Sequence, residues 1–534
     1  MTAEPLTAAA PAAVTGSRPA TAAAARSFIG KRRRRNWLDW YTTGFALVVG
    51  GIYLADILAS PFSRFSSQAS KAAATHAAAL QAVTGAGLVI AAGAGLLLLG
   101  QALGPLVLSP ADSSWLLLTP LSRRGILRRP ALAAAIWATL GGALLGVLAL
   151  AMAGPYLHTA TLSPGSDSLP GSWLALSAIA GAGCSLAAVA AGALAQPGER
   201  TRVLVRVVWA VLAVIALAGA LISQGSTALT RAVTTVFGGL TTPDFAAAAI
   251  AGVALACAAW LLLWRAMAAF PAAALRSDSA RSGRVLLAAG VLNFSLLFWI
   301  AEDNHWRGRL LRSRPWPQLP PALALAWADW RRLSRRPGPL IVVTIAAVFP
   351  ALLGAAFTGK AHGILIAAGL VVGAMAAGLQ GTTAARRDMD SGTLRRLLGV
   401  NPGHVLLART VLPALLCTAW LALALTVLPA VGALSGWWWP LFALAGPGIA
   451  AGVLRLARTA PVDPSDRGPD TPMGNTPPWM VSRIFSIAVA AIGSYPLISA
   501  VLAGNDGPGK LIGQPIISAA VLIVYLLIAA GTGR

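Results

Sequence analysis

The chain is a succession of long apolar runs separated by short polar segments. Each run has about 18 to 25 residues without charge, which is long enough to cross a hydrocarbon core of roughly 30 Å as an α-helix. The runs are continuous and rich in Ala and Leu, without the alternation expected of membrane strands. We therefore predict about 12 spanning helices. The predicted spans lie near residues 41–59, 80–108, 131–154, 174–195, 203–223, 245–264, 339–357, 362–384, 405–432, 438–456, 482–503 and 515–532.

The basic residues predict how these spans are oriented. All but five of the 41 Lys and Arg residues lie in the tails or in alternate loops, on one side of the predicted membrane. Cytoplasmic loops retain Lys and Arg, so this side and both termini are predicted to be cytoplasmic. We expect a multi-pass protein of the cell membrane. The five basic residues predicted on the outer side are Arg64, Lys71, Arg231, Lys360 and Lys510.

The apolar stretch at 285–301 is long enough to be a thirteenth span. However, Arg281 and Arg284 precede it, and Arg307 and Arg309 follow it. A crossing here would place one of these arginine groups on the outer side, against the distribution of the other basic residues. The pattern therefore favours a segment lying on the cytoplasmic membrane surface.

Six predicted spans lie on each side of a long arginine-rich segment. We predict a disordered, basic cytoplasmic tail at 1–36, a first six-helix half at 37–264 and a second half at 339–534. Residues 265–338 would form an interfacial, arginine-rich linker containing amphipathic helices. The predicted fold class is an all-α membrane protein, with about 12 transmembrane helices in two parallel six-helix pseudo-repeats.

Composition narrows the function classes. Charged residues make up 11% of the chain, against roughly 25% in soluble domains, so a soluble fold is excluded. The net charge of +24 could indicate nucleic-acid binding, but the basic residues lie at the ends of apolar runs and lack interleaved aromatic residues. The lipid bilayer, and no nucleic acid, is therefore predicted as a partner. The five histidines and three cysteines lack metal-ligand spacing, so no metal site is predicted.

Two cytoplasmic segments occupy corresponding places in the predicted halves. ADSSWLLLTPLSRRGILRRP (111–130) follows the second span, and MDSGTLRRLLGVNPGHVLLART (389–410) follows the eighth. Each has Asp-Ser, a Leu-rich stretch, a Pro-containing turn and basic residues leading into the next span. A second pair, at 32–41 and 327–339, places Trp, Asp and Arg just before the first span of each half. Such residues favour helices held in the membrane interface.

The segment 386–409 resembles the loop after the second span of type-2 ATP-binding-cassette (ABC) export permeases. In that family, an acidic residue, Gly-Thr, a Leu-rich stretch and a Pro turn form a coupling helix that docks on the ATPase subunit. The residues in matching positions are Asp390, Gly392, Thr393, Leu394, Leu397, Leu398 and Pro402. The first-half segment matches more loosely, through Asp112, Leu116, Leu117, Pro120 and Arg123, with Ser114-Trp115 in place of Gly-Thr. The usual family member has six spans and dimerises, whereas this chain would fuse two halves.

The resemblance implies a membrane-spanning permease subunit of an ATP-driven exporter, with a separate ABC ATPase subunit docking on the cytoplasmic coupling loops. The alternative for these loops is an ordinary basic cytoplasmic connection. The residues expected to couple to the ATPase are Asp112, Trp115, Leu117, Pro120, Arg123, Arg124, Asp390, Gly392, Thr393, Leu394, Arg395, Arg396, Leu398 and Pro402.

Two segments satisfy G-x-x-x-x-G-K, namely GAAFTGK (354–360) and GNDGPGK (504–510). A phosphate-binding loop needs Ser or Thr next, to hold magnesium, but Ala361 and Leu511 follow. Both segments also lie at predicted outer ends of spans. We therefore predict no catalytic residue, enzyme activity or cofactor in this chain, with ATP and Mg expected only in a partner subunit.

Asp56 is the only acidic residue within the predicted spans. An ionisable group in a membrane is a functional candidate, although Asp56 lies near the outer end of its span and could reach the headgroups. The scarcity of intramembrane carboxylates disfavours an ion-coupled carrier, because such carriers use them to hold the coupling ion. The main alternative to a permease is a non-transporting membrane scaffold with a permease-like fold. A membrane transferase or hydrolase lacks a supporting motif.

Overall fold

The computed structural model describes residues 71–104, 106, 108–119, 122–161, 171–225, 241–290, 318–335, 337–356, 360–390, 401–436, 438–458, 470–471, 474–475, 478–503 and 510–531. The predicted first span at 41–59, with Asp56, lies outside these residues. The described part is helical apart from a short antiparallel pairing of β1 (Asp470–Thr471) with β2 (Gly474–Asn475).

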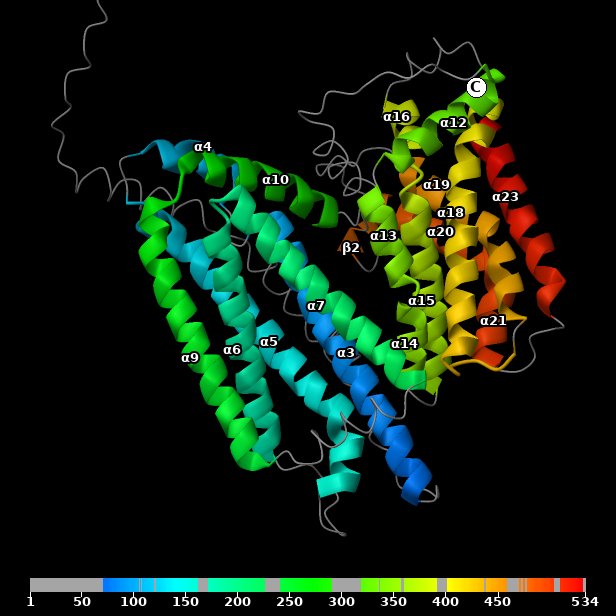
Figure 1. Cartoon of the computed structure of the whole chain (residues 1–534). Coiled ribbons are helices and arrows are strands. Elements are labelled where there is room, and N and C mark those ends of the chain that lie inside the picture. The colour runs from blue at the N-terminus through cyan, green and yellow to red at the C-terminus, as the bar shows by residue number, and fades with distance from the viewer. Residues whose placement is uncertain are drawn as a thin grey trace, which may run out of the picture.

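Among the described residues of the first half are five long helices, with α6 packed between α5 and α9, and α3 packed against α5 and α7 (Figure 1). Short elements lie across one end of these helices: α4 (Pro110–Trp115), η2 (Leu116–Leu118) and α10 (Ala272–Gly290), the last preceded by η3 (Met267–Ala269). The long helices are α3 (Lys71–Leu103), α5 (Arg123–Thr161), α6 (Gly171–Ala195), α7 (Glu199–Gly225) and α9 (Thr242–Ala266).

Small residues bring the first-half helices into backbone contact. A Cβ atom built on Gly142 of α5 would lie 2.4 Å from the Gly181 carbonyl oxygen of α6. On the other face of α6, a Cβ atom on Gly183 would lie 2.4 Å from the Gly252 carbonyl carbon of α9. Spanning helices gain packing energy from such close approach, because lipid supplies little hydrophobic driving force for their association.

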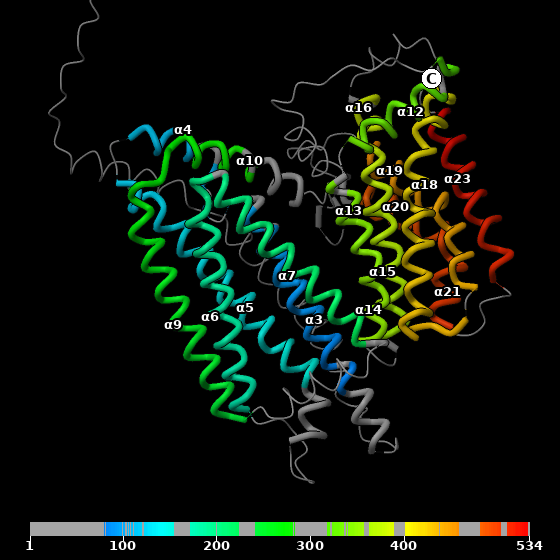
Figure 2. Tube along the Cα trace, in the orientation of Figure 1, coloured from blue at the N-terminus to red at the C-terminus, as the bar shows by residue number. Residues whose placement is uncertain are grey.

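The second half is a more compact bundle. Its elements are α13 (Pro337–Ala346), α14 (Phe349–Ala356), α15 (Lys360–Leu379), α16 (Thr383–Asp390), α18 (Pro402–Ala430), η4 (Trp439–Ala445), α19 (Gly446–Arg458), α20 (Pro478–Gly493), α21 (Tyr495–Ala503) and α23 (Gly513–Gly531). The preceding helix α12 (Pro321–Ser334) lies with α16 at the same end of the molecule as α4 and α10 (Figures 1 and 2).

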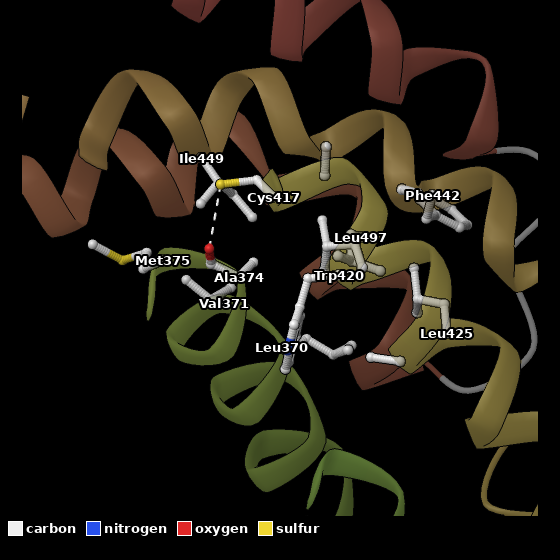
Figure 3. Close-up of a cluster of buried hydrophobic side chains, with 14 of the residues drawn as sticks. Leu370, Val371, Ala374, Met375, Cys417, Trp420, Leu425, Phe442, Ile449 and Leu497 are labelled. Carbon is white, nitrogen blue, oxygen red and sulfur yellow. Dashed lines mark hydrogen bonds between the residues drawn. The ribbon is translucent and has the colours of Figure 1, made fainter. Parts of the chain in front are cut away.

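One large apolar cluster fills the centre of the second half (Figure 3). Trp420 of α18 packs among residues of α15, α19 and α21, and its indole Nε1 donates to the Val343 carbonyl oxygen at 2.8 Å. Cys417 is fully buried, and its Sγ donates to the Ala374 carbonyl oxygen at 3.2 Å. Cys417 therefore has a packing role in this core.

Eight of the described helices are long and apolar enough to cross a membrane, and α20 with α21 makes a ninth if the bent pair is taken as one span. The chain is thus an all-α membrane protein. The arrangement of 12 spans in two repeats stays a prediction. Of the apolar stretch at 285–301, the possible thirteenth span, residues 285–290 belong to α10, and 291–301 lie outside the described part.

Two predicted spans differ from single straight helices. The span predicted at 482–503 is broken at Ser494, where α20 and α21 meet at a bend of 67°. Pro496 lacks the N–H that a continuous helix needs, and Gln514 of α23 satisfies backbone groups at the break. Its Nε2 donates to the Gly493 carbonyl oxygen and its Oε1 accepts from the Leu497 N–H, both at 2.9 Å. The span predicted at 339–357 is likewise divided, into α13 and α14.

The two halves meet through α14, which packs against α3. Leu88 of α3, Ala220 of α7, and Leu352 and Ala356 of α14 form one buried cluster. The C-terminal ends of α7 and α14 lie at the end of the molecule opposite α4, α10 and α12 (Figure 1). The surface helices are therefore remote from this contact.

Candidate partner-docking site at the arginine-rich end

The α4–η2 segment presents apolar side chains away from the protein. Ser109 caps α4, and its Oγ accepts from the Asp112 N–H at 3.0 Å. Ser113 is buried, and Leu117 packs against a buried apolar cluster that includes Leu127 and Leu263. These contacts fix one face of the segment. Trp115 and Leu118 are 77% and 72% exposed. Exposed apolar side chains on an anchored segment favour contact with a partner protein or the membrane interface.

Two predicted coupling residues tie the start of α5 to the end of α9. The Arg123 guanidinium donates to the Phe270 carbonyl oxygen. Arg124 Nη2 donates to the Arg265 carbonyl oxygen at 3.1 Å. Arg123 and Arg124 thus bind carbonyl oxygens of this chain. They hold the start of α5, which directly follows the α4–η2 segment, against the end of α9.

A buried carboxylate attaches α10 to the start of α7. Asp278 of α10 is 1% exposed and forms a bidentate pair with Arg202, in which each Nη–Oδ distance is 3.1 Å. Gln196 Nε2 also donates to Asp278 Oδ2 at 2.9 Å. We call Arg202, Asp278 and Gln196 the first-half network. Because a buried charge is costly without a partner, these contacts hold α10 in place once it has formed.

The first-half network extends to the connection before α4. Gln196 accepts from the Leu106 N–H and donates to the Leu106 carbonyl oxygen, both at 3.3 Å. The Leu108 N–H donates to Ser279 Oγ of α10 at 3.2 Å. The end of α6, α10 and the segment leading to α4 are therefore joined by buried hydrogen bonds.

A second network attaches α12 to α16 and α18. Arg409 of α18 is 9% exposed. Its Nη1 lies 2.7 Å from Asp329 Oδ1 of α12, and its Nε lies 2.8 Å from Asp388 Oδ2 of α16. Its Nη2 also donates to Asp388 Oδ1 at 3.2 Å. We call Arg409, Asp329 and Asp388 the second-half network, in which one guanidinium holds carboxylates from two other helices.

Asp329 has the most buried side chain of the second-half network. Burial raises the pKa of the Asp329 carboxyl to about 6, against the lowering effect of Arg409. Its Oδ2 is buried and has no hydrogen-bond partner among the described residues. A small cavity between α12, α16 and α18 is lined by Asp329, Arg332, Gln380 and Thr383, among others. This carboxyl is therefore ionised at neutral pH but titrates close to it.

The structure locates only part of the predicted coupling set. Asp112, Trp115, Leu117, Arg123 and Arg124 lie on α4, η2 and the start of α5. In the second half, Asp390 ends α16 and Pro402 begins α18, after the N-cap residue Asn401. The remaining predicted residues are outside the described part: Pro120, Gly392, Thr393, Leu394, Arg395, Arg396 and Leu398. Equivalence of the two loops stays a prediction.

Sequence reasoning missed both networks. Arg202 and Asp278 are 76 residues apart, and Arg409 and Asp329 are 80 apart, so no local spacing links them. The available signal was that Asp278 and Asp329 each stand in a basic segment of a chain with only 17 acidic residues. That signal marks the carboxylates but does not identify their partners.

Other candidate chemistry is limited in the described residues. Within them, no three His, Cys, Asp or Glu side chains come together as a metal site. The GAAFTGK segment joins the end of α14 at Ala356 to the start of α15 at Lys360. It therefore connects two helices, whereas a phosphate-binding loop joins a strand to a helix.

Comparison with known proteins identifies a family without an assigned activity. No curated protein and no solved structure matches the chain. The model of DUF6297, a family of unknown function, matches residues 86–466, well over half of the chain. The match runs from α3 to beyond α19 and includes both networks. The chain therefore belongs to the DUF6297 family of unknown function.

Proposed function

We propose that this chain is the membrane-spanning permease subunit of an ATP-driven, ABC-type exporter. ATP would be hydrolysed by a separate subunit docking at the arginine-rich end. The observation that carries the proposal is the anchored α4–η2 segment, where Trp115 and Leu118 project from a face held by Ser113 and Leu117. The resemblance of residues 386–409 to permease coupling loops gives further support.

The contacts around α4–η2 would let a partner move the bundle. A force on α4 would reach α5 directly and α9 through Arg123 and Arg124. Helices and their buried contacts deform little, so a displacement would pass along them as a rigid-body motion. The first-half network would carry the same motion to α7 and α10.

The docking role can be tested by affinity purification of the full chain from native membranes, with mass spectrometry of the ATPase that accompanies it. Trp115→Ala with Leu118→Ala should lower ATPase recovery by about tenfold or more, because exposed aromatic anchors dominate interface energies. The matched control is Trp137→Ala with Leu140→Ala, which removes side chains of similar exposure from the spanning part of α5. Unchanged recovery with the first pair would refute docking on α4–η2.

The second-half loop needs its own test. Asp390→Arg with Arg395→Glu should weaken association with the ATPase and reduce stimulation of its activity. If both readouts stay at the wild-type level, the coupling role of this loop is wrong, whatever the first-half variants do.

Transport itself is tested in inside-out vesicles containing the chain and its ATPase. ATP-dependent, vanadate-sensitive substrate accumulation is the expected result. ATPase association without accumulation would instead support a scaffold. Accumulation that ignores ATP and collapses with an uncoupler would support an ion-coupled carrier.

A further inference from the structure

Four arginines and a tyrosine surround the C-terminal end of α19. Arg455 and Arg458 lie in its last turns, Arg386 on α16, Arg483 on α20 and Tyr525 on α23. Arg386 and Arg483 are buried, at 9% and 3% exposed, whereas Arg455 and Arg458 are half-buried. We call these five residues the α19 arginine cluster. They belong to neither of the ion-pair networks.

Contacts between the helices bring this charge together. Arg458 donates a hydrogen bond to the Tyr525 hydroxyl, and the charge of Arg455 also acts on that hydroxyl. The charge of Arg386 acts on Arg483. The Arg455 guanidinium carbon lies 6.0 Å from the centroid of the Phe485 ring, within cation–π range. The helices are held by apolar packing that includes Ala385, Ala451, Leu454 and Tyr525.

The same helices offer little negative charge. The sequences of α19, α20 and α23 contain no Asp or Glu. Of the two carboxylates on α16, Asp388 is engaged by Arg409 and Asp390 is the last residue of the helix. Arg386 and Arg483 have further contacts within the fold, so the partly exposed Arg455 and Arg458 are the arginines accessible to a ligand. Arg455 Nε has no hydrogen-bond partner in the described part of the chain. Like charges partly withdrawn from water repel one another, and a bound anion would offset that repulsion.

We propose that the α19 arginine cluster binds a phosphate-bearing anion, with Arg455 and Arg458 as its direct ligands. Arg386 and Arg483 add positive charge without contacting the anion. The planar guanidinium matches phosphate oxygens in a bidentate geometry. An anionic phospholipid headgroup and free phosphate share this chemistry, and basic sites between helices on the cytoplasmic side bind such headgroups. The proposal does not depend on transport or on an ATPase partner.

The test uses the full chain in lipid nanodiscs and in detergent. One arm measures thermal unfolding in phosphatidylcholine nanodiscs with increasing phosphatidylglycerol. The other titrates inorganic phosphate into the detergent-solubilised protein. The cluster variant is Arg455→Gln with Arg458→Gln. The control is Arg128→Gln with Arg129→Gln, which removes the same charge from exposed positions near the basic end of α5.

Phosphatidylglycerol should stabilise the wild type, and the cluster variant should lower the apparent affinity by about tenfold or more. The control pair should stay within about twofold of the wild type. If inorganic phosphate binds and loses affinity in the cluster variant alone, the site is confirmed and its ligand is free phosphate. Equal losses of affinity in the cluster variant and the control pair would overturn the proposal. So would a cluster variant that binds both phosphatidylglycerol and inorganic phosphate as tightly as the wild type.

A second variant guards against misfolding of the Gln pair. Arg455→Lys with Arg458→Lys keeps both charges and loses only the bidentate geometry. It should bind phosphatidylglycerol more weakly than the wild type and more tightly than Arg455→Gln with Arg458→Gln. Phosphatidylglycerol binding by the Lys pair that equals the wild type would overturn the direct-ligand role of the guanidinium groups.

Discussion

The two halves of the molecule are stabilised in different ways. In the second half, 72% of the most apolar window of Trp439–Arg458 is buried, at the centre of one large core. In the first half, the window of Gly171–Ala195, which holds the same place in the predicted order of spans, is 28% buried, and that of Arg200–Ser223 only 6%. The second half thus carries much of its own apolar packing. The described first-half helices combine backbone contacts at glycines with surfaces suited to lipid.

Both halves nevertheless attach a surface helix through a buried carboxylate that pairs with an arginine. The first-half network has one carboxylate and an amide, whereas the second-half network has carboxylates from two helices. Arg202 lies in the first turn of α7, the fifth predicted span, and Arg409 lies in α18, the ninth. In α5, the first-half counterpart of α18, Arg128 and Arg129 are exposed. The two networks therefore use different positions of the predicted repeat.

The largest expected effect comes from removing the arginine that holds two carboxylates. Arg409→Met should lower the free energy of unfolding by about 3–5 kcal/mol, because it leaves Asp329 and Asp388 without their cation in a poorly solvated site. Denaturant titration in detergent micelles measures the change. The exposed Arg129→Met is the control and should change stability by less than about 0.5 kcal/mol. A loss below about 1 kcal/mol for Arg409→Met would mean that this network contributes little.

The first-half network should be less sensitive. Arg202→Met is expected to cost about 2–3 kcal/mol, because Gln196 still donates to Asp278 and Arg202 is itself partly exposed. Adding Asp278→Asn should recover part of that loss, since the uncompensated charge is then gone. The same titration measures both variants. A larger loss for Arg202→Met than for Arg409→Met would reverse the comparison between the halves.

Glycine substitutions compare the dense core with an open helix face. At Gly452 of α19, an added Cβ would lie 2.5 Å from the Ser486 carbonyl oxygen and 2.8 Å from Ala490 Cβ. Gly452→Ala should therefore destabilise by about 1–3 kcal/mol. At Gly95 of α3, a Cβ meets nothing within 4 Å, and Gly95→Ala should be neutral or slightly stabilising. Thermal unfolding in micelles checks both, and equal losses would contradict the difference in packing.

The smallest expected effect is a pH dependence specific to the second-half network. Burial raises the pKa of Asp329 from its ordinary 3.8 to about 6, so the folded state binds this proton more tightly than the unfolded state. Its contribution to stability is greatest below about pH 4 and is lost as the pH rises to about 6. Unfolding curves of wild type and Asp329→Asn, measured between pH 5 and 7, should differ by a component of about 1 kcal/mol with this sign. Parallel curves would exclude it.

Local patterns predicted the helical elements well. Continuous apolar runs predicted the spanning helices, because a segment in lipid needs apolar side chains and must satisfy its backbone N–H and C=O groups internally, as a helix does. The basic segment before the third predicted span extends that helix, so α5 begins at Arg123, several residues before the expected 131. The Trp-Asp-Arg segment at 327–339 falls largely in the surface helix α12, as its composition indicated.

The sequence by itself determined the class of protein, the approximate helices and the concentration of arginine in alternate loops, because hydrophobicity and charge act at each position along the chain. Tertiary structure alone decided which charges meet and where a helix can break. Arg409 finds Asp329 only after α12 packs on α18, and the break at Ser494 depends on Gln514 from another helix. The α19 arginine cluster likewise arises only when α16, α19, α20 and α23 pack together. Burial and pairing depend on which helices become neighbours, and no local pattern encodes that.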